Sequence, residues 1–371
     1  MVGYGACLGS VIASGNMPEP SISMNSVHLG AAVPNPATSG SSPLRFSVVI
    51  PSYLRPSYLV GCLRALQAQT RAPEEVIVVL RDDDLESRRA LEQFIAAEAG
   101  PLSISLRTVS QPGFLPPIAA GIQAAQGDVV AFLDDDAEPL PDWLQRLASH
   151  YADPRVGGVG GRCLNMENGR EVLYPIASRV GVFYWFGRVV GNMYREVAGS
   201  APRSVDFFMG GNMSYRRDAL RRVRLDSTLN RNVAFHYEID LGLQVKELGY
   251  QLLYDPLARI RHFSAPRPEM GMRARNSDSV YFASHNLLYI TLKHTRGVRR
   301  ALALAYAFTV GGRQDWGLLA ILFETLHLRF RWWREWRPAF RAKFHAFRAI
   351  FQAKRSNLPA FSHLEEPSWK S

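Results

Sequence analysis

The pattern of hydrophobic and polar residues changes abruptly at Phe46. Residues 1–44 are rich in Gly, Ser, Pro, Ala and Asn and have no periodicity, which predicts a disordered leader. Four short apolar runs have the length of buried strands, and they occupy residues 46–51, 74–80, 103–109 and 128–133. Between these runs, apolar residues recur at helical spacing and predict helices over 55–69, 82–100 and 118–125.

Strands that alternate with helices in this way are typical of a parallel, doubly wound α/β sheet. Ligands bind such a sheet outside the carboxyl ends of its strands. Polar loops stand at three of these ends, over residues 51–55, 81–84 and 134–136. Because loops are commonly polar, the first two carry little weight alone. The third, with three consecutive aspartates, is the informative one.

Asp134, Asp135 and Asp136 follow directly after an apolar strand. Their mutual repulsion is unfavourable unless a cation neutralises it. Asp134 and Asp136 are two residues apart, so both can point to one side and share a divalent cation, while Asp135 points away. Carboxylate oxygens suit Mg²⁺ or Mn²⁺, which bind the phosphate oxygens of substrates. The alternative is that Asp136 only caps the helix that follows.

A second motif, GGNMSYRRDAL, begins at Gly210. Gly210 and Gly211 lack side chains and allow the backbone to approach a bound group closely. Asn212 adds a short polar contact, and a helix is predicted to open at Arg216. The alternative is an ordinary turn before a helix.

A third motif, HYEIDLGLQVKELGY, predicts a helix with an apolar stripe and with Gly249 as its C-cap. Glu238 lies one turn before the stripe and faces inward at the helix start. A carboxylate in this position is either a structural cap or a base held where it can act. Asp240 occupies another face and is the better candidate for a structural partner. His262 follows a short strand predicted over 250–255, and it is either a hydrogen-bonded histidine or a ligand of the metal or the phosphates.

Composition limits the classes of protein that remain. A chain of 371 residues with 47% hydrophobic and 20% charged residues can form a sizeable core and is not disordered throughout. Its three cysteines are too few and too scattered for a disulfide framework or a structural zinc site, which favours a reducing compartment. The net charge of +10 comes entirely from residues 293–371, which hold 15 Lys and Arg against 5 Asp and Glu. The main domain is therefore neutral overall.

The basic C-terminal region predicts three helical segments with clustered Trp, Phe and Arg, over 299–312, 316–330 and 331–355. Basic residues near aromatic ones suit an interfacial helix that lies on anionic lipid. The alternative is that these helices pack on the main domain or on a second subunit. We expect no nucleic-acid partner, because no recognised binding module accompanies the charge. No uninterrupted apolar run reaches the roughly 18 residues of a transmembrane helix, so we expect a soluble or peripheral protein.

Four segments, together with the tripeptide IRH at residues 260–262, resemble the family 2 glycosyltransferases. They are SVVIPSYLRPSYLVGCLRAL, QGDVVAFLDDDAEPLPDWL, GGNMSYRRDAL and HYEIDLGLQVKELGY. The resemblance covers residues 46–294 and implies the GT-A fold, a Rossmann-like mixed α/β sheet flanked by helices. It also implies inverting transfer of a sugar from a nucleoside-diphosphate sugar to an acceptor hydroxyl, with a divalent metal, Mg²⁺ or Mn²⁺.

The resemblance also assigns roles to individual residues. Asp134 and Asp136 match the family's metal-binding DxD pair, and His262 is the candidate third ligand. Glu238 falls where the family usually has the Asp that serves as catalytic base, and Asp240 is the alternative base. The residues expected to bind the donor are Pro51, Ser52, Tyr53, Arg55, Asp83 and Asp135. Those expected to line the acceptor site are Gly210, Gly211 and Asn212.

The chain departs from the family pattern at two places. After the second strand the family more often shows Asp-Asp-Gly-Ser, and this chain has LRDDDLES. At the base, a Glu stands where Asp is usual and Tyr237 replaces the preceding acid. The carboxylate of Glu238 would therefore reach about one methylene farther than that of the usual Asp.

The predicted organisation is a leader over 1–44, a GT-A catalytic domain over 45–294, a basic aromatic helical extension over 295–356 and a flexible tail over 357–371. We expect a role in cell-surface polysaccharide, exopolysaccharide or glycolipid biosynthesis, with a glycan or a lipid-linked acceptor. The expected location is the cytoplasm or the inner face of the cell membrane. There are two rival functions. The first is a metal-dependent nucleotidyltransferase, but such an enzyme usually has a Gly-rich basic phosphate loop, and the segment PSYLRPS is not one. The second is a non-catalytic nucleotide-sugar-binding protein.

Overall fold

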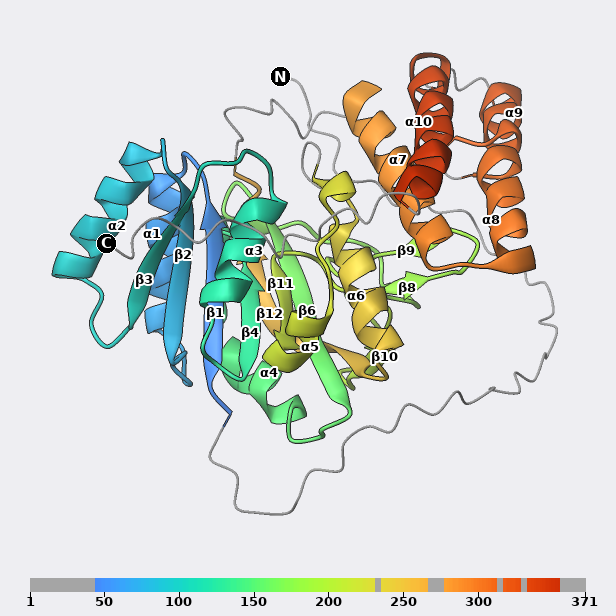
Figure 1. Cartoon of the computed structure of the whole chain (residues 1–371). Coiled ribbons are helices and arrows are strands. Elements are labelled where there is room, and N and C mark those ends of the chain that lie inside the picture. The colour runs from blue at the N-terminus through green and yellow to red at the C-terminus, as the bar shows by residue number, and fades with distance from the viewer. Residues whose placement is uncertain (1–43, 231–234, 266–276, 312–315, 328–331, 354–371) are drawn as a thin grey trace. The chain divides into compact units, whose positions relative to one another are not determined.

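The computed structural model describes residues 44–230, 235–265, 277–311, 316–327 and 332–353 (Figure 1). The leader predicted over 1–44 lies outside these residues except for its last position. The tail predicted over 357–371 lies outside them entirely.

The first half of the domain is the predicted parallel sheet. Its strands are β1 (Phe46–Ser52), β2 (Glu75–Arg81), β3 (Ile104–Val109) and β4 (Val129–Leu133), and they lie in the order β3-β2-β1-β4, all parallel. The helices between them are α1 (Pro56–Gln67), α2 (Leu85–Ala97) and α3 (Leu115–Ala124). The prediction for α3 began three residues late. Pro116 lies in the first turn of this helix, where a missing N–H costs nothing, so it does not stop the helix.

The second half makes the sheet mixed. The long strands here are β6 (Val156–Glu167), β11 (Asn212–Arg216) and β12 (Gln251–His262). Strand β11 lies between β4 and β6 and is antiparallel to both, and β12 runs parallel to β6. The short strands are β5 (Ala137–Pro139), β7 (Arg170–Glu171), β8 (Val182–Phe183), β9 (Val189–Val190) and β10 (Arg203–Val205). The short strand predicted over 250–255 is wrong in extent, because β12 continues through a bulge to His262.

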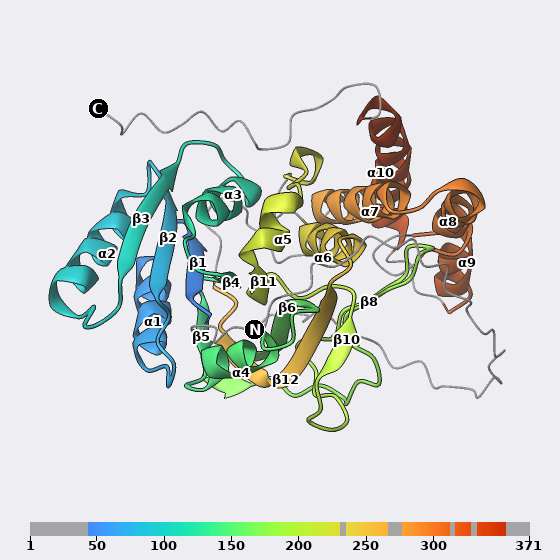
Figure 2. The same cartoon turned by 60° about the horizontal axis from the view of Figure 1, so that its bottom comes forward.

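Alternation along the strands supplies two hydrophobic cores, one on each face of the sheet. Val48 and Ile50 of β1 belong to one core, and Val49 between them belongs to the other. Helices α1, α2 and α4 (Trp143–His150) cover the first face. Helices α3, α5 (Arg217–Arg222) and α6 (Tyr237–Glu247) cover the second face (Figures 1 and 2). A short 3₁₀ helix, Ser227–Leu229, connects α5 toward α6.

Four helices follow in the described residues after β12: α7 (Ser277–Lys293), α8 (Gly297–Thr309), α9 (Leu318–Leu326) and α10 (Trp332–Ala353). The last three lie where three helical segments were predicted. Lys343 of α10 is fully buried and donates hydrogen bonds to the carbonyls of Ala307 in α8 and of Trp316 before α9. Trp316 in turn donates to Glu335 of α10 at 2.9 Å, so these contacts tie the three helices together. Within the described residues, no helix combines the length and apolarity needed to cross a bilayer.

Strand β6 escaped sequence analysis because its first half, VGGVGG, is rich in glycine, which weakens the strand pattern. The structure shows why one of these glycines is required. A Cβ on Gly161 would lie 1.7 Å from the backbone oxygen of Ala258, at the bulge of β12. The two strands can therefore pair at this point only without a side chain.

We predict that Gly161→Ala destabilises the fold by about 3 kcal/mol, because the backbone of β12 must move to admit the new methyl group. The matched control is Gly191→Ala, since a Cβ at Gly191 meets nothing within 4 Å. Denaturant unfolding followed by circular dichroism measures both changes. Equal unfolding midpoints for the two variants would contradict the prediction.

Candidate functional site

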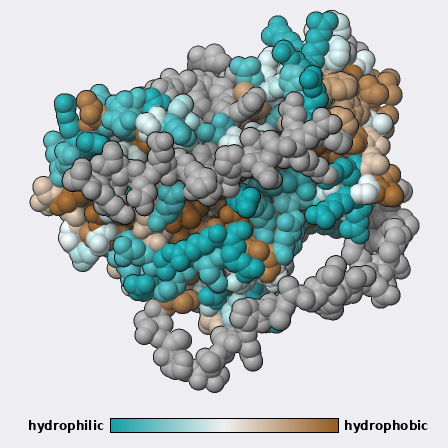
Figure 3. Space-filling view, viewed as in Figure 1, coloured by the Kyte–Doolittle hydropathy of each residue, from teal (hydrophilic) through white to brown (hydrophobic). Residues whose placement is uncertain are grey.

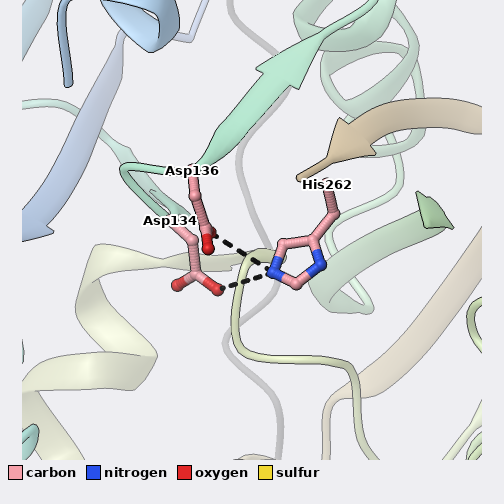
Figure 4. A group of neighbouring side chains, drawn as sticks. All are labelled: Asp134, Asp136 and His262. Carbon is pink, nitrogen blue, oxygen red and sulfur yellow. Dashed lines mark ion pairs between the residues drawn. The ribbon is translucent and has the colours of Figure 1, made fainter. Parts of the chain in front are cut away.

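The carboxyl ends of β4 and β12 bring Asp134, Asp136 and His262 together (Figure 4). One ligand atom from each residue lies within 4.8 Å of the others. The imidazole Nε2 of His262 is 3.3 Å from Oδ1 of Asp136 and 3.8 Å from Oδ2 of Asp134. The antiparallel pairing of β5 with β12 sets this arrangement, because it places His262 opposite Ala137, the residue that follows the three aspartates.

Asp136 is held in one orientation from behind. Its Oδ2 accepts a hydrogen bond from the backbone N–H of Ala265 at 2.8 Å and lies 3.4 Å from Nη1 of Arg55. Its other oxygen, Oδ1, is the one that faces His262. The alternative that Asp136 caps a helix is wrong, because β5 follows it and Asp142 occupies the N-cap of α4.

Asp135 is buried and is not part of the cluster with His262. Its carboxylate accepts hydrogen bonds from Ser52 Oγ at 2.7 Å and from Arg55 Nη1 at 2.8 Å. Burial raises the pKa of Asp135, and the Arg55 guanidinium limits that rise. Ser52, Arg55 and Asp135, all three predicted to bind the donor, therefore form a buried support that joins the end of β1 to the aspartate loop.

The half-buried Tyr53 and Arg81 and the exposed Asp83, at the ends of β1 and β2, form a second group. The guanidinium of Arg81 lies 4.0 Å from the centre of the Tyr53 ring, and it donates to Asp83 at 2.9 Å. The hydroxyl of Tyr53 is 3.5 Å from Asp83. The Arg81 contact holds the pKa of Asp83 below its ordinary value. Pro51, the remaining residue predicted to bind the donor, is half-buried near the end of β1.

Gly210 and Gly211 border the acidic cluster. A Cβ on Gly211 would lie 2.6 Å from an oxygen of Asp134, and a Cβ on Gly210 would lie 2.9 Å from the hydroxyl of Tyr237. A side chain at either position would therefore displace Asp134 or Tyr237. This pair brings the start of β11 close to both Asp134 and the start of α6.

Asn212 occupies a different position from the one predicted. It is fully buried, and its amide accepts from Trp143 Nε1 at 2.8 Å. It also donates to the carbonyls of Arg162 and Ala258. Because these bonds tie α4, β6 and β12 together, Asn212 supports the core and does not line an acceptor site.

Glu238 lies in the first turn of α6 and is partly buried. Burial raises its pKa to about 7, and the negative charge of Asp134 adds to the rise. This carboxylate is therefore close enough to the acidic cluster to feel its charge. A group with a pKa near 7 can accept a proton near neutral pH.

Asp240, two residues farther along α6, faces α7 instead. Its carboxylate binds Lys293 Nζ and His294 Nε2, both at 2.8 Å, and accepts from Gln244 at 2.9 Å. Asp240 is 2% exposed. These interactions anchor α6 to the end of α7. They agree with the expectation that Asp240, on another face of the helix, is a structural partner. Glu238 is therefore the base in the proposal below.

Positive backbone φ angles flank the site. Among the described residues, five that are not glycine have such angles, and three of them are Leu54, His236 and Ser264. Leu54 precedes Arg55, His236 precedes α6, and Ser264 lies between His262 and Ala265 in the chain. Strained backbone of this kind persists only where surrounding structure enforces it, and it concentrates at functional sites. Neither these backbone angles nor the role of Ala265 has a signature in the sequence. Arg81 lies in the polar loop 81–84 but was not among the predicted site residues.

A family model described as Glycosyl transferase family 2 matches residues 47–224. The chain carries a family 2 glycosyltransferase domain. The pre-mycofactocin glycosyltransferase of Mycobacterium tuberculosis is 29% identical over 255 residues, which cover 66% of this chain and 48% of that protein. The glucosyl-dolichyl phosphate glucuronosyltransferase of Haloferax volcanii is 26% identical over 228 residues, 59% of this chain and 69% of the relative. The chain thus spans about half the length of the first of these relatives.

Two solved structures share the fold of the family 2 domain. GalNAc-T7, with UDP, GalNAc and Mn²⁺, superposes with a TM-score of 0.56 and 16% identity over 86% of this chain and 59% of that one. The mannosyltransferase PcManGT from Pyrobaculum calidifontis, with GDP-Man and Mn²⁺, has a TM-score of 0.50 and 16% identity over 85% and 89% of the two chains. The predicted GT-A fold, a mixed sheet flanked by helices, is confirmed. The family match does not favour the rival nucleotidyltransferase.

The contact between α6 and α7 predicts a pH-dependent stability. Burial alone would lower the pKa of His294, but hydrogen bonds to Asp240 and Glu247 outweigh it and raise that pKa to about 9. A pKa raised in the folded state stabilises the fold below the unfolded value near 6.5, and this contribution is lost as pH rises through 9. We expect a loss of about 3 kcal/mol over this range.

His294→Gln should remove this fall in stability between pH 6.5 and 9. The control is His327→Gln, because His327 is exposed on the C-terminal side of α9 and bonds only to a backbone oxygen of that helix. Thermal unfolding across the pH range measures the difference. The same pH dependence in both variants would contradict the role given to His294.

Proposed function

We propose that the chain transfers a sugar, with inversion, from a nucleoside-diphosphate sugar to an acceptor hydroxyl. The observation that carries the proposal is the meeting of Asp134, Asp136 and His262 at the carboxyl ends of two strands in a family 2 domain. The charge of Asp134 also acts on Glu238, which lies in the first turn of α6. The nucleotide-sugar ligands named for PcManGT and GalNAc-T7 support a donor of this class.

The acidic cluster fits a divalent cation. Two carboxylates and an imidazole present one atom each within 4.8 Å, and the hydrogen bond from Ala265 to Oδ2 of Asp136 fixes its Oδ1 toward the other two. Carboxylate oxygens suit Mg²⁺ or Mn²⁺, and the imidazole favours Mn²⁺ of the two. When bound, the cation would neutralise charge on the departing diphosphate. The Mn²⁺ named in both neighbouring structures supports this assignment.

Glu238 is the base in this proposal. Its carboxylate takes the proton of the acceptor hydroxyl while that oxygen bonds to the anomeric carbon, and the bond from this carbon to the diphosphate breaks on the opposite face. A single displacement of this kind needs no nucleophile from the protein. The pKa of about 7 keeps much of Glu238 ionised at neutral pH and still basic enough to accept a proton.

Tyr53, Arg81 and Asp83 lie where the nucleotide of the donor is expected, at the carboxyl ends of β1 and β2. Gly210 and Gly211 border the acceptor side in this proposal, next to Tyr237 and Asp134. The buried residues Ser52, Arg55 and Asp135 act indirectly, by holding the aspartate loop.

The acceptor in this proposal is a glycan or a lipid-linked glycan of a cell-surface or extracellular polysaccharide pathway. The names of two relatives support this class: one acts on a glucosyl-dolichyl phosphate, and the O-antigen biosynthesis protein RfbC of Myxococcus xanthus is 33% identical over 261 residues. That match covers 66% of this chain and 19% of RfbC. We place the enzyme in the cytoplasm or on the inner face of the membrane.

We predict that Mn²⁺ binds the isolated protein at the acidic cluster. Asp134→Asn and His262→Gln should each weaken binding at least about tenfold, because each removes a ligand or a charge. Titration calorimetry or the electron spin resonance of free Mn²⁺ measures the affinity. Asp83→Asn is the matched control, since it removes a carboxylate at the end of a neighbouring strand. A similar loss in all three variants would contradict this metal site.

The donor is first identified by Mn²⁺-dependent hydrolysis of a panel of nucleotide sugars. We predict that the rate of transfer from this donor rises with pH through about 7, because Glu238 loses its proton. Glu238→Gln should retain donor binding and lower kcat by roughly 10² to 10⁴. The exposed Glu92→Gln on α2 is the control and should match the wild type. Retained transfer in Glu238→Gln would assign the base to another residue. Absence of any metal-dependent donor turnover would overturn the proposed function and favour a non-catalytic binding protein.

A further inference from the structure

Helix α9 is packed with most of its large apolar residues outward. The exposed residues of this nine-residue helix include Leu318 (60% exposed), Leu319 (55%), Leu322 (53%), Phe323 (46%) and Leu326 (73%). Their spacing places all five on one side. The side turned toward the neighbouring helices carries Ala320, Ile321 and Glu324, of which Ala320 and Ile321 pack on a small core around Trp316. This polarity is the reverse of that of an ordinary surface helix.

Helix α8 adds to the same kind of surface. Val298 and Leu302 are 75% and 51% exposed, one turn apart on this helix. Hydrophobic colour gathers over α8 and α9 in the space-filling view (Figure 3). We call these seven residues, Val298, Leu302, Leu318, Leu319, Leu322, Phe323 and Leu326, the apolar face. Of the sixteen large apolar side chains that the described residues expose, eleven lie between Val298 and Phe347.

The charge of this extension has one sign at its surface. Arg334, Arg337, Arg341 and Arg348 are exposed along α10, in a row that we call the basic stripe. Within the described residues from 297 to 353, the acids are Glu324 and Glu335, and both are less than a tenth exposed. Trp333 and Phe344 are exposed beside the arginines, at 66% and 59%.

Packing within the protein already uses the other sides of these helices. Ala346 and Ile350 of α10 and Ala307 of α8 join the larger hydrophobic core, and His345 hydrogen bonds to Tyr281 of α7 at 2.6 Å. The alternative that the extension packs on the main domain therefore accounts for its inner sides. It leaves the apolar face and the basic stripe to be explained, and a contiguous exposed apolar patch such as the one on α9 marks an interaction site.

We propose that the apolar face and the basic stripe dock the protein onto an anionic lipid surface. Exposed Leu and Phe would enter the boundary of the acyl chains, while arginines and Trp333 would contact the head groups. The positive charge of the basic stripe favours an anionic lipid surface over a second copy of the chain as the binding partner. A second copy would bring a surface of the same positive sign, whereas an anionic membrane attracts each arginine.

This docking would bring the enzyme to acceptors that are themselves anchored in lipid. That part of the inference rests on the proposed function, whereas the contact with lipid does not. Helix α8 begins directly after Lys293 and His294, which bind Asp240 of the helix that carries Glu238. The membrane-docked helices and the proposed base are thus joined through one cluster of buried ion pairs.

Sedimentation of the full-length protein with vesicles tests the proposal. The wild type should bind vesicles of phosphatidylcholine with 30% phosphatidylglycerol, bind pure phosphatidylcholine at least about tenfold more weakly, and leave the anionic vesicles at high salt. The first variant, Leu319→Gln with Leu322→Gln and Leu326→Gln, should weaken binding to the anionic vesicles at least about tenfold. Its control replaces Ile95, Leu173 and Ile176, exposed apolar residues of the main domain, by Gln.

The second variant reverses the charge of Arg334, Arg337 and Arg341 by substitution with Glu, and it should also weaken binding at least about tenfold. Its control makes the same change at Arg89, Arg221 and Arg222, which are exposed on α2 and α5. Circular dichroism and thermal unfolding confirm the fold of each variant. If the α9 variant does not fold, the arginine variant still decides.

Three results would overturn the proposal: no binding by the wild type, wild-type affinity in both extension variants, or equal losses in the controls. A fourth result would come from light scattering during gel filtration. If the wild type is a dimer, and the α9 variant alone is a monomer with unchanged lipid binding, the apolar face binds a second copy. Metal-dependent donor hydrolysis without vesicles should be the same in all four variants and the wild type. Its absence from the wild type would remove the proposed function and leave the lipid contact standing.

Discussion

The pairing of β5 with β12 is the interaction on which the candidate site depends. Strand β5 has only three residues, yet it aligns Ala137 with His262 across more than a hundred residues of chain. It thereby closes the acidic loop against the end of a strand from the other half of the sheet. Without this register, Asp134 and Asp136 would stand at the end of β4 without the imidazole of His262 beside them.

Three consecutive aspartates repel one another, and the fold gives each a different environment. Asp135 turns inward to Arg55 and Ser52, whereas Asp136 is held by the Ala265 N–H and Asp134 packs against the glycine at 211. The opposite charge of Arg55 stabilises the buried pair, and the remaining negative charge is directed toward one side. This division is what makes the loop suited to a divalent cation. The positive φ angles at Leu54, His236 and Ser264 show how much of the backbone is held by this arrangement.

Helix α6 joins the site to the rest of the chain. Glu238 and Asp240 are two residues apart, so they point to different sides of the helix. One carboxylate lies near the acidic cluster, and the other binds Lys293 and His294 at the end of α7. Helix α8, which carries part of the apolar face, begins three residues after His294. Catalysis and lipid contact, as proposed, thus involve helices that meet at this group of ion pairs.

The sequence by itself determined the strands β1 to β4, the helices between them, the family and the spacing of the carboxylates, because these follow from periodicity and from neighbours along the chain. Tertiary structure decided what depends on long-range pairing. It placed His262 beside the aspartates, buried Asn212 in the core, and turned glycine-rich β6 into a central strand. It also decided which side of α9 is exposed, because LLAILFETL is apolar around most of its circumference and only packing selects the side that meets solvent.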